Sequence, residues 1–208
     1  MKKFITTISL QFKDLDPMVY TAVDNKDLQY EEPIAFPILS AIHASVQKDE
    51  HIIVYPILLM DSSSEGVSNH NFELFEKELQ ALSVQNGFTF EIQKIEHSAS
   101  DDIDSLLSLF SKMLDIPKDD DMLSACITYG TKPISIVTMM ALHYSYKVKT
   151  NLDIKHIVYG KRIWGGEAKG EIYDVTPLFY VNSAVEHLAK LQIQSPENAL
   201  RAMLDLGE

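Results

Sequence analysis

The chain has 208 residues, a formal net charge of -12, and a composition that is 46% hydrophobic and 23% charged, as in one ordinary globular domain. No stretch approaches the roughly 20 apolar residues of a membrane-spanning helix, so a spanning protein is excluded. The acidic charge argues against sequence-independent adhesion to duplex nucleic acid or anionic membranes. A single cysteine, Cys126, excludes an internal disulfide and suits a reducing cytoplasm; we expect its thiol to be inert core.

Two segments of opposite charge lie within this acidic chain. Residues 101–121 hold seven aspartates against two lysines, a balance of -5, and residues 129–170 hold seven lysines and arginines against two acidic residues, a balance of +5. The basic segment is either a solvated lysine-rich face or a place that receives a small polyanion.

Helices and strands alternate along the chain, which predicts a Rossmann-like α/β fold: a mostly parallel sheet with helices on both faces. The apolar runs predict strands at residues 4–10, 51–60, 88–95, 123–128 and 154–159. Helices are expected from about 33 to 47, around an apolar stripe at 72–82 that ends at Asn86-Gly87, from about 100 to 114, and from 133 to about 146. Residues 11–32 are expected to be a long polar connection and residues 61–66 a loop.

Three details of the helices are expected. Pro33 suits a first helical turn, and Ser100 is a plausible N-cap that places aspartates at the positive end of the next helix. In the helix that starts at Pro133, the apolar side chains of Ile136, Met140 and Tyr144 are expected to face the sheet.

The C-terminal third is expected to contain a β-hairpin and then helices. Four glycines between Gly160 and Gly170 forbid a helix and predict a hairpin that ends near residues 172–174. Thr176-Pro177 opens a helical region to about residue 206, interrupted near Ser195-Pro196. We therefore divide the chain into a main domain at 1–194 and, at 195–208, a C-terminal helix or the start of a linker to a further domain.

The turn at residues 128–133 carries the clearest chemistry. Gly130 permits a positive φ and close backbone approach, Thr131 offers a hydroxyl and a possible N-cap, and Lys132 places an ammonium beside the positive end of a helix. The turn is either an ordinary strand-to-helix connection or an anion site at the carboxyl edge of the sheet.

Residues 127–135, Ile-Thr-Tyr-Gly-Thr-Lys-Pro-Ile-Ser, resemble the Thr-Gly-Gly-Thr-Lys turn of CARF domains, the CRISPR-associated Rossmann-fold sensors of cyclic oligoadenylates. Tyr159-Gly160 and residues 172–177 also look like landmarks of that family. One position departs from the family pattern: Tyr129 stands where a first glycine is common, and it either adds a ring for adenine stacking or narrows the pocket.

The resemblance implies a homodimer whose two turns line a shared groove for a ring of adenylates, with four adenylates favoured and six possible. It implies a role in type III CRISPR antiviral signalling, with no cofactor and no metal. A hairpin lid carrying Arg162 and Trp164 is one possibility for this groove, and packing of the lone Trp is the other. The expected ligand-binding residues are Ser9, Leu10, Gln11, Thr128, Tyr129, Gly130, Thr131, Lys132, Arg162 and Trp164.

Some CARF domains are metal-independent ring nucleases, in which the ribose 2′-hydroxyl attacks the adjacent phosphate. In that case Lys132 stabilises the transition state, and Ser9 or Thr131 orients the attack. Because no histidine or second lysine adjoins the turn, we favour binding without efficient cleavage.

Other functions have weaker support in the sequence. Asp153, Glu167 and Lys169 match the sparse Asp…Glu-x-Lys pattern of magnesium-dependent nucleases. The seven histidines have no zinc-ligand spacing, and neither arginine begins an Arg-x-x-x-x-His ribonuclease motif. The absence of Gly-x-Gly-x-x-Gly after the first strand, and of a Walker A motif, argues against other nucleotide-binding Rossmann families.

Overall fold

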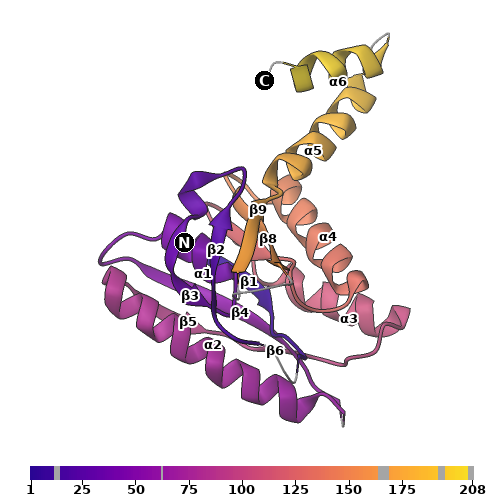
Figure 1. Ribbon diagram of the computed structural model, residues 1–208. Coiled ribbons are helices and arrows are strands. Elements are labelled where there is room, and N and C mark those ends of the chain that lie inside the picture. Colours follow the sequence, from indigo (N-terminus) through magenta and orange to yellow (C-terminus); the bar gives the residue numbers. More distant parts are fainter. Residues whose placement is uncertain (12–14, 62, 164–168, 192–194, 206–208) are drawn as a thin grey trace.

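The computed structural model describes residues 1–11, 15–61, 63–163, 169–191 and 195–205, which form a layered α/β fold with helices on both faces of one mixed sheet (Figure 1). The strands are β1 (Lys2–Thr7), β2 (Met18–Ala22), β3 (Tyr30–Ile34), β4 (His51–Leu59), β5 (Thr89–Ile92), β6 (Ile95–His97), β7 (Met122–Cys126), β8 (Asp153–Ile163) and β9 (Lys169–Asp174). The helices are η1 (Lys26–Leu28), α1 (Ile38–Ser45), α2 (Glu65–Asn86), α3 (Ile103–Leu114), α4 (Lys132–Val148), α5 (Thr176–Leu191) and α6 (Pro196–Asp205).

The sheet has the order β3-β2-β9-β8-β7-β1-β4-β5, and β6 also pairs with β4. Its centre, from β8 to β5, is parallel, whereas β8–β9 and β2–β3 are antiparallel. After β1 the chain forms β2 and β3 at one edge of the sheet, then places β4 and β5 on the other side of β1, and later returns to place β7 and β8 between β1 and that first edge. The predicted Rossmann-like α/β class is therefore confirmed, and the strand order reverses between β1 and β7.

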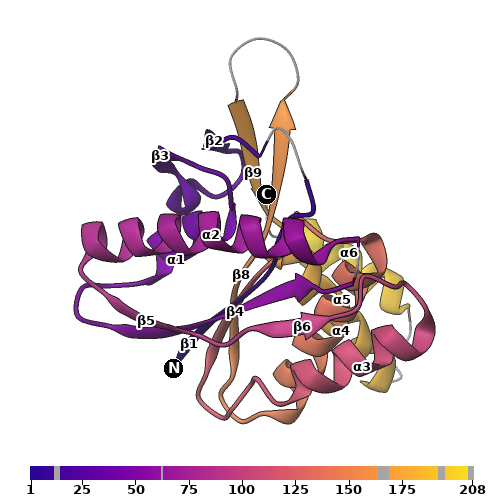
Figure 2. The ribbon, with the colours of Figure 1, turned by 90° about the horizontal axis from the view of Figure 1, so that it is seen from below.

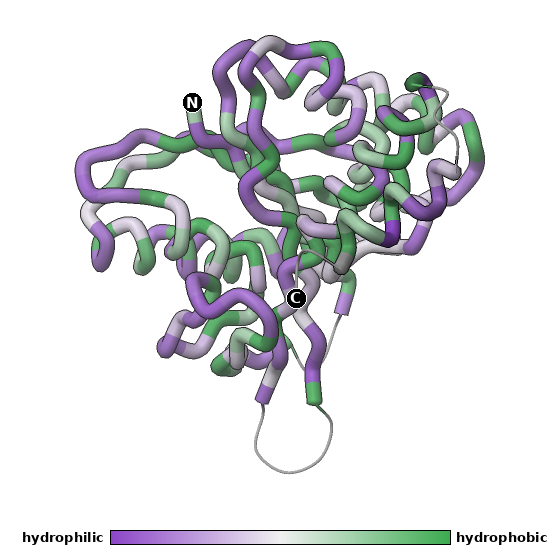
Figure 3. The backbone as a smooth tube through the Cα atoms, turned by 90° about the horizontal axis from the view of Figure 1, so that it is seen from above, coloured by the Kyte–Doolittle hydropathy of each residue, from purple (hydrophilic) through white to green (hydrophobic). Residues whose placement is uncertain are grey.

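Two hydrophobic clusters fill the two sides of the sheet. Alternate residues of β1 show the division, because Phe4 belongs to the cluster under α1 and α2 while Ile5 belongs to the cluster under α3, α4 and the start of α5. Figure 2 shows α1 and α2 on one side of the strands and α3 and α4 on the other. Hydrophobic stretches of the chain run through the middle of the molecule, and hydrophilic stretches gather in the outer connections (Figure 3).

The expected polar connection at 11–32 was wrong, because the structure places β2, η1 and the first part of β3 within 18–32. These elements bury Met18, Tyr20 and Leu28 in the core under α1. The β2 segment, Met-Val-Tyr-Thr-Ala, is itself mostly β-forming, and the prediction missed it because polar residues flank this short run. The first helix also begins later than expected, after the N-cap Pro37. Pro33 lies instead in the edge strand β3, where a missing N–H breaks no sheet ladder.

Several other boundaries differ from the prediction. The expected strand at 88–95 is two short strands, β5 and β6, which both pair with β4. Helix α2 begins at Glu65, inside the expected loop, and ends as predicted at Gly87, whose φ of 72° is left-handed. Helix α3 is capped by Asp102 rather than Ser100, through a bond from the Ser105 amide.

Helix α4 lies where the sequence predicts it but turns a different face to the sheet. Its buried side chains include Ile134, Val137 and Ala141, whereas Ile136, Met140 and Tyr144 are exposed. The helical spacing was right and the assigned face was wrong, because two apolar stripes share this helix and periodicity does not rank them.

The predicted C-terminal hairpin is confirmed as β8 and β9, which project beyond the rest of the sheet (Figure 2). Asp174 fixes its end: the carboxylate accepts bonds from Asn25, His156 and Thr176. Burial opposes ionisation of this carboxyl, but the hydrogen bonds outweigh it and lower its pKa to about 2. Helices α5 and α6 then extend away from the sheet (Figure 1). Within the described ranges no helix is long and apolar enough to cross a membrane.

One half-buried carboxylate connects α2 to the loop before α1. The two oxygens of Glu78 accept bonds from the Ala35 amide at 2.9 and 3.0 Å. Burial raises the pKa of Glu78 to about 7, although the bonds from the Ala35 and Phe36 amides work in the opposite direction.

Glu78 makes stability depend on pH with a defined sign. The folded chain takes up a proton near pH 7 and the unfolded chain near pH 4.5, so the free energy of unfolding rises as the pH falls from about 8 to about 5. Glu78→Gln should remove this rise, measured by urea unfolding across that range. Glu76→Gln, an exposed position on the same helix, is the control and should keep it; an unchanged pH profile in Glu78→Gln contradicts the assignment.

Candidate functional site

The reversal of strand order between β1 and β7 brings two predicted segments to the same edge of the sheet. β1 ends at Thr7 and leads to residues 9–11, while β7 ends at Cys126 and leads to the turn at 128–132. Both segments lie at carboxyl ends of parallel strands, where open α/β sheets bind ligands. This edge is our candidate site.

A cavity of about 320 Å³ opens at this edge, a volume at the small end of the range for small-molecule sites. It is lined by Gln11, Leu15, Asp16, Met18, Tyr20, Thr128, Tyr129, Tyr159, Gly160, Lys161 and Arg162. Four of these, Gln11, Thr128, Tyr129 and Arg162, are among the residues expected from the sequence. The lining combines three tyrosines with two cations and one carboxylate.

Two glycines let the Tyr20 ring form the floor of the cavity. Tyr20 pairs with Gly170 across β2 and β9, and a Cβ at Gly170 would lie 2.5 Å from Tyr20 Cδ1. A Cβ at Gly160 would lie 2.3 Å from Pro37 Cγ and 3.1 Å from Tyr20 Cε1. The ring therefore crosses β9 towards β8 only because both positions lack a side chain. Burial raises the pKa of Tyr20 to about 12, so its phenol is neutral at physiological pH.

Tyr129 and Thr128 are fixed by the core rather than free to move with a ligand. The Tyr129 hydroxyl donates to the Ala35 carbonyl at 2.7 Å, and its ring lies edge-on to Phe36. The Thr128 hydroxyl accepts a bond from the Gly160 amide at 2.7 Å. The Tyr129 ring lines the cavity and packs partly into the core, and stacking of adenine on it stays a prediction.

The turn that begins α4 lies beside the cavity. Gly130 has a φ of 94°, and a Cβ there would lie 3.0 Å from Thr7 Cγ2, so the predicted need for glycine is confirmed. Within the part of the chain that the structure describes, the amides of Gly130, Thr131 and Lys132 donate to no other residue. Lys132 is exposed and does not line the cavity. Free amides at the positive end of a helix favour an anion.

An acidic side chain from the loop that precedes α3 already approaches this turn. Thr131 occupies the N-cap position as predicted, but its hydroxyl donates to Asp101 Oδ1 at 2.6 Å instead of capping the helix. Asp101 belongs to the acidic segment whose expected role was at the start of α3. The structure therefore brings one carboxylate to the place where an anion would bind.

The segment after β1 is held by a buried asparagine. Asn71 of α2 donates to the carbonyl oxygens of Ser9 at 2.7 Å and Gln11 at 3.1 Å. Ser9 is buried, and its hydroxyl accepts a bond from the Gln11 amide. Leu10 is exposed, and Gln11 reaches the cavity. Ser9 and Thr131, the two hydroxyls considered for orienting a cleavage reaction, thus both have partners within the chain.

The hairpin contributes the cavity's positive charge. Arg162 and Lys161 follow each other in β8 and both line it. Lys161 also pairs with Glu171 at 3.4 Å, and this bond raises the lysine pKa. Trp164, the other residue of the expected lid, lies outside the described residues, as does Glu167.

Sequence reasoning missed Tyr20 and Lys161 and gave Tyr159 no role in binding. Tyr20 was hidden because its strand was not recognised, and alternation alone does not say which hairpin residues face a cavity. The glycine spacing at 160 and 170 was a usable signal, since it marks places where another group approaches the backbone closely.

The magnesium-nuclease pattern does not converge in space. Asp153 begins β8 and accepts a bond from the Tyr180 hydroxyl, whereas Lys169 pairs with Ile163 at the other end of that strand. Ten residues of strand span about 33 Å, so this alternative was wrong for the described pair. The described residues also contain no group of three or more His, Cys, Asp or Glu side chains arranged to hold a metal ion.

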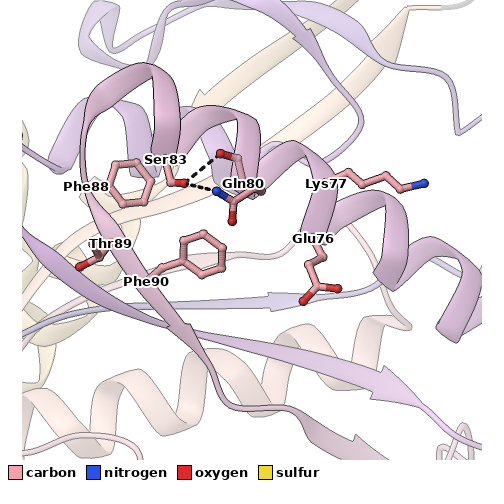
Figure 4. A pocket seen from close by; sticks show the side chains of 7 residues that line it. All are labelled: Glu76, Lys77, Gln80, Ser83, Phe88, Thr89 and Phe90. Atoms are coloured by element: carbon pink, nitrogen blue, oxygen red, sulfur yellow. Dashed lines mark hydrogen bonds between the residues drawn. The ribbon is translucent and has the colours of Figure 1, made fainter.

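A larger hollow of about 690 Å³ lies between α2 and the beginning of β5 (Figure 4). Phe88 and Phe90 form its apolar wall, and Glu76, Lys77 and Gln80 border it from the helix. It adjoins the amino end of an edge strand, away from the edge at which parallel sheets bind ligands. We therefore do not choose it as the site.

Comparisons with known proteins do not identify this site. No protein-family model matches the chain, and no curated protein matches it. The geometry of the site and the resemblance of the turn at 127–135 are therefore the grounds on which a function can be proposed.

Gly160→Ala should destabilise the fold by about 2 kcal/mol, because the added Cβ overlaps the rigid Pro37 ring. The measurement is the midpoint of chemical unfolding. Gly66→Ala is the matched control: no atom lies within 4 Å of its Cβ, and a helical alanine is intrinsically favoured over glycine. Equal midpoints for wild type and Gly160→Ala would show that the cavity floor is not packed as described.

Proposed function

We propose that the chain binds a cyclic oligoadenylate at a homodimer groove, as the cytoplasmic sensor part of type III CRISPR antiviral signalling. A ring of four adenylates is favoured and six are possible, and the bound state is read by a fused or separate effector domain. The observation that carries the proposal is the juxtaposition, at the switch point of the sheet, of a tyrosine-lined cationic cavity and a helix start with free amides.

The chemistry of this juxtaposition suits a nucleotide. Tyr20, Tyr129 and Tyr159 offer aromatic surface for a purine, and Arg162 offers a planar cation for a phosphodiester. The amides at the start of α4 offer further donors outside the cavity. A cavity of about 320 Å³ accommodates one part of a ring rather than all of it, which favours a second copy of the site.

The exposed apolar row on α4 supports a homodimer. Ile136, Met140 and Tyr144 recur at every fourth residue and form one ridge, with Ile136 61% exposed. Ridges of this spacing pack well against their symmetric copies. The helix begins at Lys132, so a two-fold axis that runs roughly parallel to α4 beside this ridge would bring the two turns towards each other.

Binding should depend on the charges around the turn, with opposite signs for two substitutions. Lys132→Ala removes an ammonium and should weaken binding of cyclic tetraadenylate about tenfold or more. Asp101→Asn removes the carboxylate beside Thr131 and should tighten it several-fold. Calorimetry at fixed salt measures both, with one ring expected per dimer. Lys155→Ala, an exposed lysine near the amino end of β8, is the control; wild-type affinity in Lys132→Ala would remove the site.

The alternative function is a metal-independent ring nuclease that ends the signal. Lys132 is available to it, but the hydroxyls of Ser9 and Thr131 are bonded to Gln11 and Asp101, which favours binding without efficient turnover. Product analysis of the same mixtures, incubated with chelator, separates the two functions. We expect the ring to remain intact, and linear products ending in a 2′,3′-cyclic phosphate would establish the nuclease instead.

The dimer should depend on the α4 ridge. Met140→Glu places a charge in the middle of the proposed contact and should convert the dimer to a monomer at micromolar concentration, as measured by light scattering. Val84→Glu is the control, because Val84 is a 74% exposed apolar residue on α2, far from the ridge in the fold. A dimer that survives Met140→Glu would place the contact elsewhere.

A further inference from the structure

A second hollow lies on the other face of the hairpin from Tyr20. Gly160 and Gly170 meet the Tyr20 ring, and neighbouring strand residues point to the opposite face. There a hollow of about 480 Å³ has mainly apolar walls. It is lined by Asp24, Tyr159, Lys161, Tyr173, Asp174, Val175, Pro177 and Leu178.

The second hollow is continuous with the candidate site through two shared residues. Tyr159 and Lys161 line both cavities. β7 ends at Cys126, opposite Val158, so among the described residues β8 has no strand neighbour on that side beyond this point. The Gly160 amide there is bonded to the Thr128 side chain instead. The two hollows therefore meet at Tyr159 and Lys161, and a ligand that occupies both would contact these two residues.

We propose that this second hollow is the subsite for an adenine base of the bound cyclic oligoadenylate, an inference that rests on the function proposed above. Tyr159 and Tyr173 lie with ring centroids 6.3 Å apart, and Leu178 at the first turn of α5 is 68% exposed. Together with Pro177, these side chains form an apolar and aromatic surface on which a flat base can pack.

The charges of the hollow favour a base over a phosphate. Its lysine is already paired with Glu171, and two of its lining side chains are carboxylates. Asp174 is saturated by its bonds to Asn25, His156 and Thr176. Asp24 is exposed and uses one oxygen, Oδ1, to accept the Asp174 amide. Its second oxygen is placed to accept from the exocyclic amine of adenine, whereas a diester would be repelled.

Titration of cyclic tetraadenylate into three variants tests the subsite. Leu178→Ser removes an apolar side chain from the proposed surface, and Tyr173→Leu removes an aromatic ring. Each substitution should weaken binding of cyclic tetraadenylate about tenfold. Asp24→Asn keeps an oxygen for the Asp174 amide but turns an amino group towards the base, and should also weaken binding. Val185→Ser is the matched control, a 41% exposed apolar residue further along the same helix, and should bind like wild type.

The outcomes separate this inference from the function on which it rests. If wild type binds no cyclic tetraadenylate, both the sensor function and the subsite are wrong. If wild type binds and all three variants keep its affinity, the subsite is wrong while the sensor function stands. If the substitutions change the mass in light scattering and leave affinity per dimer unaltered, the hollow is a contact between copies, which also overturns the subsite. Thermal unfolding of each variant verifies that the fold is retained.

Discussion

Parallel pairing of β1 between β4 and β7 is the constraint on which the rest of the structure depends. The register joins Phe4 to Val54 on one side and to Ser124 on the other, so successive residues of β1 enter opposite hydrophobic clusters. Because the chain reaches these two neighbours by crossovers in opposite directions, their following loops separate at the carboxyl edge and leave room for a ligand. The arrangement of the strands, rather than any one side chain, therefore determines where the site lies.

The walls of the cavity pack closely because Gly160 and Gly170 have no side chains. Tyr20 lies across Gly170, and Pro37 and Tyr20 close over Gly160. Tyr129 is tied to the Ala35 carbonyl, while the Ala35 amide is held by Glu78. A lining of this kind is rigid, and rigid aromatic walls reduce the entropy lost when a flat ligand is bound. The same contacts link the site to the core under α1 and α2.

An acidic protein can receive an anionic messenger when its few cations and free amides are concentrated. Here Lys161 and Arg162 line one cavity and Lys132 begins the adjacent helix. Asp101 opposes them by occupying the Thr131 hydroxyl, which disfavours weakly bound anions and favours a ligand that makes several contacts at once. The proposed preference for a ring of adenylates over free phosphate is consistent with this balance of charges.

The sequence by itself determined the α/β class, the approximate positions of the main strands along the chain, and the turn at 128–132, because apolar runs and a glycine requirement are local properties of the chain. It also located part of the cavity lining, through Gln11, Thr128, Tyr129 and Arg162. Only the tertiary structure decided that the polar segment Tyr30–Ile34 forms an edge strand, and which of two apolar stripes on α4 is buried. It alone brought Tyr20 beside β8 and Asp101 beside Thr131. These outcomes depend on contacts between residues far apart in the chain, and the local periodicity of a sequence does not predict such contacts.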